Sequence, residues 1–363
     1  MKKMTSKRTT VMTNDFPNLK KAGIFTDIHF GRKNASEIHN QDCIDFITFF
    51  IKQCKKHKVD HIVFGGDWFE HRDSIAGRTL HYSHKAMTLI KEEMGDMPFF
   101  FLVGNHDLVF RNNRGTFNTK IFEPFRNMII VDENLSVTIG GRSVLFSPFL
   151  FKDEYPNQIR FINSHEIVYG HFEFKGFVVT GDTKTMDHGP EHTDFKKCKR
   201  IFTGHFHKRQ NSDNVYYLGN TFPMDYSDAN DTARGMAIYE YDTDELTYID
   251  WEDGPSYISC YLSQLLDNPK KILKPKATVR CEADVDLSYE QILQLQTLLS
   301  KKFSLREFNV YEKAEEYSIS EDIDEEDLEA EDSDVVVKNL LRKVKSDKID
   351  PETLIEIFEE VKS

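Results

Sequence analysis

Short apolar segments of this chain end repeatedly in residues that can bind metal ions. The patches read Asp27-Ile28-His29, Gly66-Asp67, Gly104-Asn105-His106-Asp107, Gly170-His171 and Gly204-His205-Phe206-His207. Ligands placed where the strands of a sheet end converge in space even when they are distant in sequence. Glycines just before the ligands allow tight turns and close backbone approach. The pattern therefore predicts a fold that gathers several strand ends at one edge.

The same apolar segments alternate with amphipathic stretches over roughly the first 250 residues, which is typical of a layered α/β domain. Helices are predicted at 37–56 and 79–94, where apolar residues recur with a helical period. Strands are predicted at 22–25, 61–64, 99–103, 167–169 and 200–203, with hairpins at 135–146 and 236–249. Each ligand patch thus follows a predicted strand.

The number and type of ligands predict a pair of metal ions. Carboxylates, one asparagine and several histidines are too many for one ion, and Asp67 is the natural bridge between two. Imidazole mixed with oxygen ligands suits manganese, iron or zinc. Two such ions about 3.5–4 Å apart clamp the attacking and leaving oxygens of a phosphate ester, so the pattern favours a phosphoesterase. A single histidine such as His39 or His165 is more simply interpreted as hydrogen-bonded or surface-exposed.

Composition narrows the class of protein without deciding its substrate. The five scattered cysteines lack CxxC spacing, which favours a reducing compartment, and we expect a cytoplasmic protein. Nowhere do about 18 apolar residues run together, so the sequence predicts no membrane-spanning helix. Residues 1–20 are expected to form a flexible basic extension. Residues 321–363 carry a net charge of −10 and the rest only −3, so charge neither supports nor excludes DNA.

The pattern changes after residue 254, where the main domain predicted at 21–254 ends. We expect a small α/β capping module at 270–314, an acidic linker at 315–334 and two helices within 335–363. Apolar residues beyond a linker need burial elsewhere, which predicts a docking element for a partner protein. The residues expected to bind that partner are Leu340, Leu341, Leu354, Ile355, Phe358 and Val361. The alternative is that these helices fold back onto the small module.

Taken together, the motifs resemble those of calcineurin-like metallophosphoesterases, whose pattern is D-x-H, G-D, G-N-H-[DE], G-H and G-H-x-H. The resemblance covers residues 21–251. It is closest to SbcD/Mre-type DNA repair nucleases, and among them to the recombination endonuclease subunits of T-even-like phages. Three features select this branch: Asp107 ending the third motif, the stretch 214–223, and the small module with its helical tail. The resemblance implies a sandwich of two sheets flanked by helices.

The resemblance also implies roles for the motif residues. The two metal sites would be Asp27, His29, Asp67 and His207 for one ion, and Asp67, Asn105, His171 and His205 for the other. Manganese is the expected metal. His106 would be the acid for the leaving 3′ oxygen or a donor to the phosphoryl group, and Asp107 would orient it. Glu70 and His71 stand where cellular relatives often carry His or Asp, so their roles stay open.

On this basis we expect a DNA exo/endonuclease subunit that acts in double-strand-break repair, recombination and phage DNA replication. The resemblance implies an SbcC-type, SMC-like ATPase as its partner and a homodimer within a heterotetramer. The alternative is a small-molecule or cyclic-nucleotide phosphodiesterase, which would not need the module and the tail. No DNA-contacting residue is assigned. Four basic residues near the motifs are as readily surface cations as phosphate contacts: Arg32, Lys33, Arg111 and Arg114.

Overall fold

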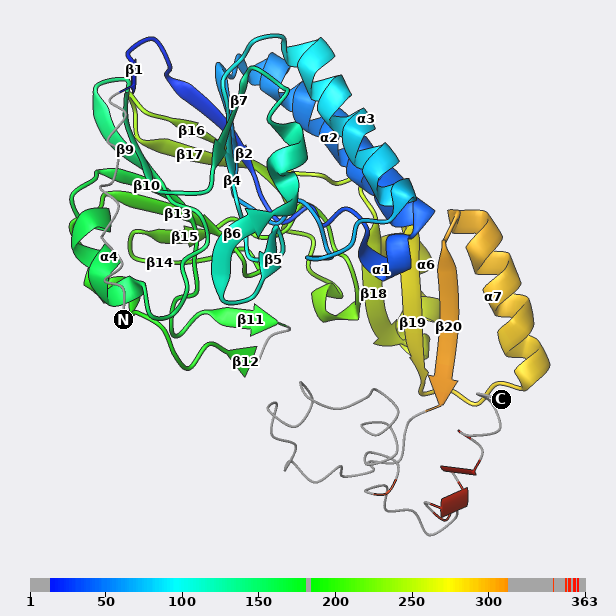
Figure 1. Ribbon diagram of the computed structural model, residues 1–363. Helices are drawn as coiled ribbons and strands as arrows, with labels where there is room; N and C mark the ends of the chain where they lie inside the picture. Colours follow the sequence, from blue (N-terminus) through cyan, green and yellow to red (C-terminus); the bar gives the residue numbers. More distant parts are fainter. Residues whose placement is uncertain are drawn as a thin grey trace.

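The computed structural model describes residues 14–180 and 184–312, together with isolated positions between residues 342 and 358. Its main part consists of two β-sheets packed face to face, with helices on the outer faces (Figure 1). This confirms the predicted α/β sandwich. None of the described helices has the length and apolar character needed to cross a bilayer.

The first sheet has six strands in the order β17-β16-β2-β3-β4-β7. These are β2 (Lys21–Phe25), β3 (His61–Phe64), β4 (Phe99–Leu102), β7 (Met128–Val131), β16 (Gly235–Glu240) and β17 (Glu245–Asp250). The neighbours from β2 to β7 run parallel, and β2, β3 and β4 are buried, which explains their almost wholly apolar sequences. Helices α2 (Glu37–His57) and α3 (Gly77–Met94) cover the outer face.

The second sheet has seven strands in the order β1-β8-β9-β10-β13-β15-β14. These are β1 (Asn14–Phe16), β8 (Leu135–Ile139), β9 (Arg142–Phe146), β10 (Ile167–His171), β13 (Arg200–Gly204), β14 (Gln210–Ser212) and β15 (Val215–Tyr217). Phe100 of the first sheet stacks on Phe146 of the second, with ring centroids 4.2 Å apart. Helix α4 (Tyr155–Ile162) packs on the outer face, so the layers run helix, sheet, sheet, helix.

Strand β1 corrects the predicted extent of the flexible N-terminal extension. Residues 14–16 pair in parallel with β8, although the segment was expected to be unstructured up to residue 20. The Phe16 ring lies edge-on to Phe100, with centroids 5.5 Å apart, and so fixes a segment whose other residues are largely polar. Residues 1–13 lie outside the described part of the chain.

Shorter elements lie in the connections between these strands and helices. They are α1 (Arg32–Ala35), β5 (Leu108–Phe110), β6 (Asn113–Phe117), η1 (Asn118–Phe122), β11 (Val178–Thr180), β12 (Lys184–Thr185), η2 (His192–Phe195) and η3 (Tyr226–Asp228). The hairpins β5·β6 and β11·β12 form separate two-stranded sheets.

A small module follows the main domain, with a three-stranded parallel sheet in the order β18-β19-β20. Its elements are β18 (Ser256–Tyr261), α5 (Leu262–Asp267), α6 (Pro269–Ile272), β19 (Ala277–Ala283), α7 (Tyr289–Phe303) and β20 (Glu307–Glu312). It therefore begins at Ser256, before the predicted start at residue 270. Arg306 joins it to α2 through a two-point contact with Asp42, at 2.7 and 2.5 Å.

The predicted linker and much of the predicted docking element lie outside the described residues. Leu340, Leu341, Leu354 and Val361 are among these. Ile355 and Phe358 are described as helical, and Ile355 is buried while Phe358 is half-buried.

Candidate metal centre

The ligand patches come together because the strands that precede them are parallel neighbours. Strands β2, β3 and β4 lie side by side in one sheet and lead to Asp27, Asp67 and Asn105. In the other sheet, β10 ends at His171 beside β13, which is followed by the motif of His205 and His207. All the predicted metal ligands are therefore gathered where the ends of these five strands meet.

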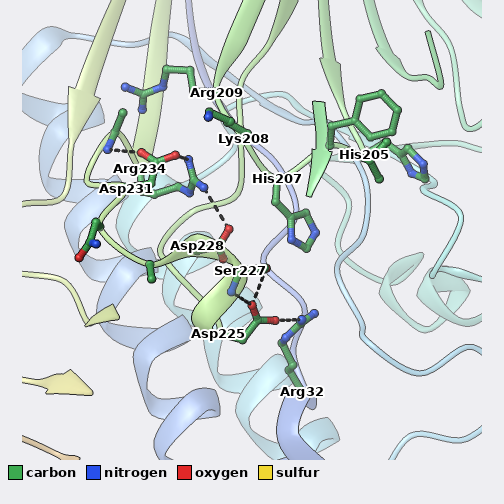
Figure 2. Close-up of a pocket in the computed structure, with 15 residues that line it drawn as sticks. Arg32, His205, His207, Lys208, Arg209, Asp225, Ser227, Asp228, Asp231 and Arg234 are labelled. Atoms are coloured by element: carbon green, nitrogen blue, oxygen red, sulfur yellow. Dashed lines mark hydrogen bonds and ion pairs between the residues drawn. The ribbon is translucent and has the colours of Figure 1, made fainter. Parts of the chain in front are cut away.

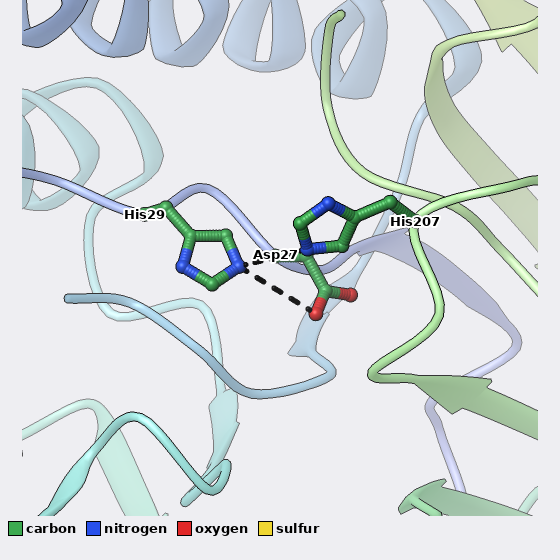
Figure 3. A group of neighbouring side chains, drawn as sticks. All are labelled: Asp27, His29 and His207. Atoms are coloured by element: carbon green, nitrogen blue, oxygen red, sulfur yellow. Dashed lines mark hydrogen bonds and ion pairs between the residues drawn. The ribbon is translucent and has the colours of Figure 1, made fainter. Parts of the chain in front are cut away.

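One cluster consists of Asp27, His29 and His207, whose ligand atoms lie within 4.8 Å of one another (Figure 3). His29 Nε2 lies 3.1 Å from His207 Nε2 and 4.0 Å from Asp27 Oδ1. Asp27 and His29 are buried. These are three of the four residues predicted to hold the first ion.

A second cluster consists of Asp67, His171 and His205, with Asn105 between them. Asn105 Oδ1 lies 2.9 Å from both His171 Nε2 and His205 Nδ1. His171 Nε2 lies 3.3 Å from Asp67 Oδ2. This matches the second predicted ligand set.

Asp67 stands between the two clusters and has one oxygen directed at both. Its Oδ2 atom lies 3.8 Å from His29 Nε2 and 3.3 Å from His171 Nε2. Its Oδ1 atom accepts a hydrogen bond from the backbone N–H of His106 at 2.8 Å. The geometry thus suits a carboxylate that bridges two ions.

The outward-facing nitrogens of three ligand histidines meet acceptors. His171 Nδ1 lies 2.8 Å from the Gly65 carbonyl oxygen, His29 Nδ1 lies 2.9 Å from Glu70 Oε2, and His205 Nε2 lies 3.0 Å from Glu173 Oε1. When the outward nitrogen of each ring carries the proton, the inner nitrogen presents a lone pair to the lone pairs of the other ligands. Carboxylates and carbonyls behind ligand histidines are typical of metal sites. The donor set therefore fits divalent cations.

Charges in the site also favour a cation. Burial alone would lower the pKa of His171, but the adjacent Asp67 carboxylate raises it to about 9. Burial raises the pKa of Asp27, and the nearby Asp67 charge adds to this. Burial would likewise raise the pKa of Glu70, but His29 and Arg32 hold it well below its usual range. Buried carboxylates at close range thus create a negative potential that a divalent cation would neutralise.

Four of the ligands adopt a backbone conformation that is unusual for residues other than glycine. The φ angles are 53° at Asp27, 51° at His29, 63° at Asp67 and 91° at His205. Hydrogen bonds between the loops hold this geometry, with Asp27 N–H donating to the Gly66 carbonyl and His29 N–H to the Asp67 carbonyl. Non-glycine residues persist in this region only where their surroundings fix them, often at functional sites.

Two motif glycines allow the loops to approach one another. A Cβ atom at Gly104 would lie 2.2 Å from Asp67 Oδ1, and one at Gly204 would lie 2.1 Å from Thr26 Oγ1. Real Cβ atoms do not approach other atoms so closely, so any side chain here would displace the ligands. The predicted role of these glycines in close approach therefore has a steric basis.

His106 lies at the edge of the centre, but Asp107 does not orient it. One His106 ring nitrogen lies within 4.8 Å of the ligand atoms of His29 and Asp67, and Nδ1 lies 2.7 Å from the Glu70 carbonyl oxygen. The Asp107 carboxylate instead accepts backbone N–H groups at 2.9–3.3 Å, from Asp67, Trp68, Phe69 and Gly104. The prediction that Asp107 positions the His106 ring is therefore wrong, because its oxygens fasten the second ligand loop to the third.

Glu70 and Glu173 are functional candidates that the motifs did not identify. Glu70, whose role was left open, faces His29, and Glu173, which was not predicted, faces His205. A carboxylate two residues after His171 was the available signal for Glu173, but its partner lies 32 positions away in the sequence. His71 is exposed and lines a small crevice with Phe69 and Ile75.

The basic residues near the motifs are largely occupied. Arg32 contacts Glu70 at 3.2 Å and Asp225 at 2.6 Å, and Arg114 pairs with Glu154 at 2.6 Å. The Lys33 ammonium lies 4.5 Å from the centre of the Tyr257 ring. These three residues therefore stabilise local structure, and Arg111 lies close enough to Arg72 to lower its pKa.

A cavity of about 680 Å³ adjoins His205 and His207 (Figure 2). Arg234, which is 3% exposed, forms part of its wall and is held by Asp228 at 3.0 Å and Asp231 at 2.8 Å. Arg32 and Asp225 form another part. This cavity is large enough for an elongated polar molecule to approach His205 of one cluster and His207 of the other.

Comparisons with known proteins identify a phage protein of similar sequence. Exonuclease subunit 1 of Enterobacteria phage T4 is 26% identical over 226 residues, which are 61% of this chain and 65% of that protein. The match thus spans just under two thirds of the length of that relative.

Two solved structures share a weaker likeness. A dimetal phosphatase from Danio rerio has a TM-score of 0.39 and 9% identity, covering 61% of this chain and 92% of that one. GAP50, the anchor in the inner membrane complex of Plasmodium, has a TM-score of 0.36 and 13% identity, covering 64% and 88%.

The family assignment rests on the match to a family model. The calcineurin-like phosphoesterase model matches residues 20–209, more than half of the chain, and includes every ligand described above. Such a family implies divalent metal ions, for which the two clusters supply ligands. This chain belongs to the calcineurin-like phosphoesterase family.

Proposed function

We propose that this phosphoesterase is a DNA nuclease subunit that hydrolyses phosphodiester bonds with two metal ions. The observation that carries the proposal is the pair of ligand clusters that share Asp67 Oδ2. The similarity to a phage exonuclease subunit supports DNA as the substrate. Recombination, repair and phage DNA replication are the processes proposed for it.

The proposed metals are two Mn²⁺ ions, which would polarise the phosphate and activate water when bound. Asp27, His29, Asp67 and His207 would hold one ion, and Asp67, Asn105, His171 and His205 the other. The chain contributes a fixed orientation to these groups, since Glu70 and Glu173 hold the rings of His29 and His205. Thr26 and the backbone N–H of His205 hold the Asp27 carboxylate.

His106 is proposed as the proton donor to the leaving oxygen. Its Nδ1–H donates to the Glu70 carbonyl at 2.7 Å, which fixes the ring and leaves Nε2 to act on the substrate. Burial lowers the pKa of His106, so its protonated ring is a stronger acid than a free imidazolium. Asp107 would act only indirectly, by holding the ligand loops in place.

The substrate assignment is tested by comparing DNA with a small diester. Purified full-length chain is incubated with Mn²⁺ and either end-labelled double-stranded DNA or bis-p-nitrophenyl phosphate. A DNA nuclease should have a far higher kcat/KM for DNA than for the small diester. Turnover of the small diester or of cyclic nucleotides without DNA cleavage would contradict the proposal and favour a small-molecule phosphodiesterase.

The partner proposed for the chain is an SbcC-type, SMC-like ATPase, bound through the C-terminal helices. The word "subunit" in the name of the phage relative supports a complex. The acidic stretch that precedes the apolar residues of the tail is consistent with a tethered docking element. A homodimer within a heterotetramer is part of the same proposal.

A further inference from the structure

The side chain of Asn105 has an unusual neighbour beside its Nδ2 atom. Its Oδ1 atom is directed at His171 and His205, while Nδ2 lies 3.1 Å from Arg72 Nη2. Both of these nitrogens carry only hydrogens to donate. Two donors at this distance are unfavourable unless an acceptor is shared between them.

Rotation of the Asn105 amide would remove the contact between the two donors, but it would place a donor among the metal ligands. Exchange of its oxygen and nitrogen would let Arg72 donate to Oδ1, but it would turn the NH₂ group toward His171, His205 and Asp67. The second ion would then lose an oxygen ligand and meet a donor in its place. With Oδ1 directed at the metal site, Nδ2 and Arg72 must face each other.

Arg72 also lacks an acceptor within the described part of the chain. No hydrogen bond or ion pair joins its guanidinium to any residue of 14–180 or 184–312, although it is half-buried. The nearby carboxylates are engaged, Asp67 by His106 N–H and the histidines, and Asp107 by four backbone N–H groups. Burial lowers the pKa of Arg72, and the Arg111 charge lowers it further against the opposing charge of Asp67. An anion from outside the chain would supply the acceptor that the Arg72 guanidinium lacks.

We infer that Arg72 and the Asn105 amide together bind an oxygen of the phosphodiester that is cleaved. This rests on the proposed function, because it assumes a phosphate ester at the metal centre. An oxygen of that phosphate accepts from Nδ2–H and from the guanidinium at once, which resolves the contact between two donors. A planar guanidinium is well suited to phosphate oxygens.

The position of the amide identifies which phosphate is bound. Oδ1 and Nδ2 belong to one planar group, so an acceptor beside Nδ2 lies next to the site to which Oδ1 points. Arg72 therefore contacts the reacting group, and its contribution should not depend on the length of the substrate.

The test compares Arg72→Ala and Arg72→Lys with Arg160→Ala, which removes the same charge from an exposed position on α4. Each protein is loaded with Mn²⁺, and its metal content and melting temperature are measured first. Inorganic phosphate binding is then measured by isothermal titration calorimetry, and kcat/KM is measured for bis-p-nitrophenyl phosphate and for DNA. Calorimetry reports on the anion site even if no substrate is turned over.

Loss of a charged hydrogen bond predicts that Arg72→Ala weakens phosphate binding and lowers kcat/KM for both substrates by about 10- to 100-fold. Metal content should stay unchanged, Arg72→Lys should recover part of the loss, and Arg160→Ala should match the wild type. Phosphate binding equal to wild type in Arg72→Ala, or a loss confined to DNA, would overturn the inference. Failure of the wild type to cleave DNA would instead contradict the proposed function.

Discussion

Asp67 Oδ2 faces both ligand clusters, so a single substitution there should disturb both metal sites. We expect Asp67→Asn to reduce bound Mn²⁺ below one equivalent, whereas His171→Ala and His207→Ala should each lose one of two ions. Activity should fall by about 1,000-fold or more in all three, because two-metal hydrolysis needs both. Inductively coupled plasma mass spectrometry after gel filtration measures the ions. Exposed His81 provides the control as His81→Ala.

Glu70 and Glu173 orient ligand histidines without belonging to either cluster. Glu70→Gln and Glu173→Gln should each weaken Mn²⁺ binding by about 10- to 100-fold, which is the usual effect of removing a carboxylate behind a metal-bound histidine. The affinity is measured by titration of metal-free protein, with the exposed Glu290→Gln as a matched control. Unchanged affinity in both variants would argue against this role.

His106 provides a test that separates acid catalysis from metal binding. His106→Asn should keep both ions and lose about 100- to 10,000-fold in DNA cleavage, the range expected for a general acid. Bis-p-nitrophenyl phosphate has a good leaving group that needs no proton, so its hydrolysis should fall much less. An equal loss on both substrates would assign His106 to stabilising the phosphoryl group instead.

The residues proposed as ligands could be named from the sequence because each belongs to a short motif that follows a predicted strand. The sequence could not predict what lies behind them. Asp107 was expected to orient its neighbour His106, yet its oxygens reach backbone groups of the loop around Asp67, 40 positions earlier. Arg72 carries no motif at all, and only the folded structure places it against Asn105.

At the scale of elements, the strands were predictable where burial makes them almost wholly apolar. The predicted bounds of β3, residues 61–64, agree with the structure residue for residue. Strand β18 was missed because its sequence, Ser256–Tyr261, mixes polar and apolar residues after the turn at Gly254-Pro255. It becomes a strand through pairing with β19, a contact that local periodicity does not report.

The attachment of the small module to α2 makes a prediction at this scale. Asp42 is nearly buried at the Arg306 contact, so Arg306→Ala leaves its charge without a partner and should cost roughly 2–4 kcal/mol of unfolding free energy. Lys276→Ala removes a more exposed contact to Asp45 on the same helix and should cost about 1 kcal/mol or less. Urea denaturation followed by circular dichroism measures both. Equal effects would show that burial does not set the strength of this contact.

For the whole molecule, the metal centre and the proposed docking element lie in separate parts of the chain. Every metal ligand precedes residue 210, whereas the apolar tail begins after residue 335. A chain that ends near residue 315 should keep metal-dependent nuclease activity within about two-fold, because it retains both sheets and the small module. It should fail to co-purify with the proposed SbcC-type ATPase when the two are co-expressed. Retained co-purification would locate the docking surface elsewhere.

The left-handed backbone at four metal ligands has a consequence for how such a chain can change. A non-glycine residue in this conformation costs about 1–3 kcal/mol, and the buried carboxylates repel one another without a cation. Asp27→Gly should therefore melt at a higher temperature than the wild type when both are measured in EDTA, while losing metal. Selection for thermal stability alone would remove these residues first. These residues lower the thermal stability of the metal-free chain at the positions where metal binding requires them.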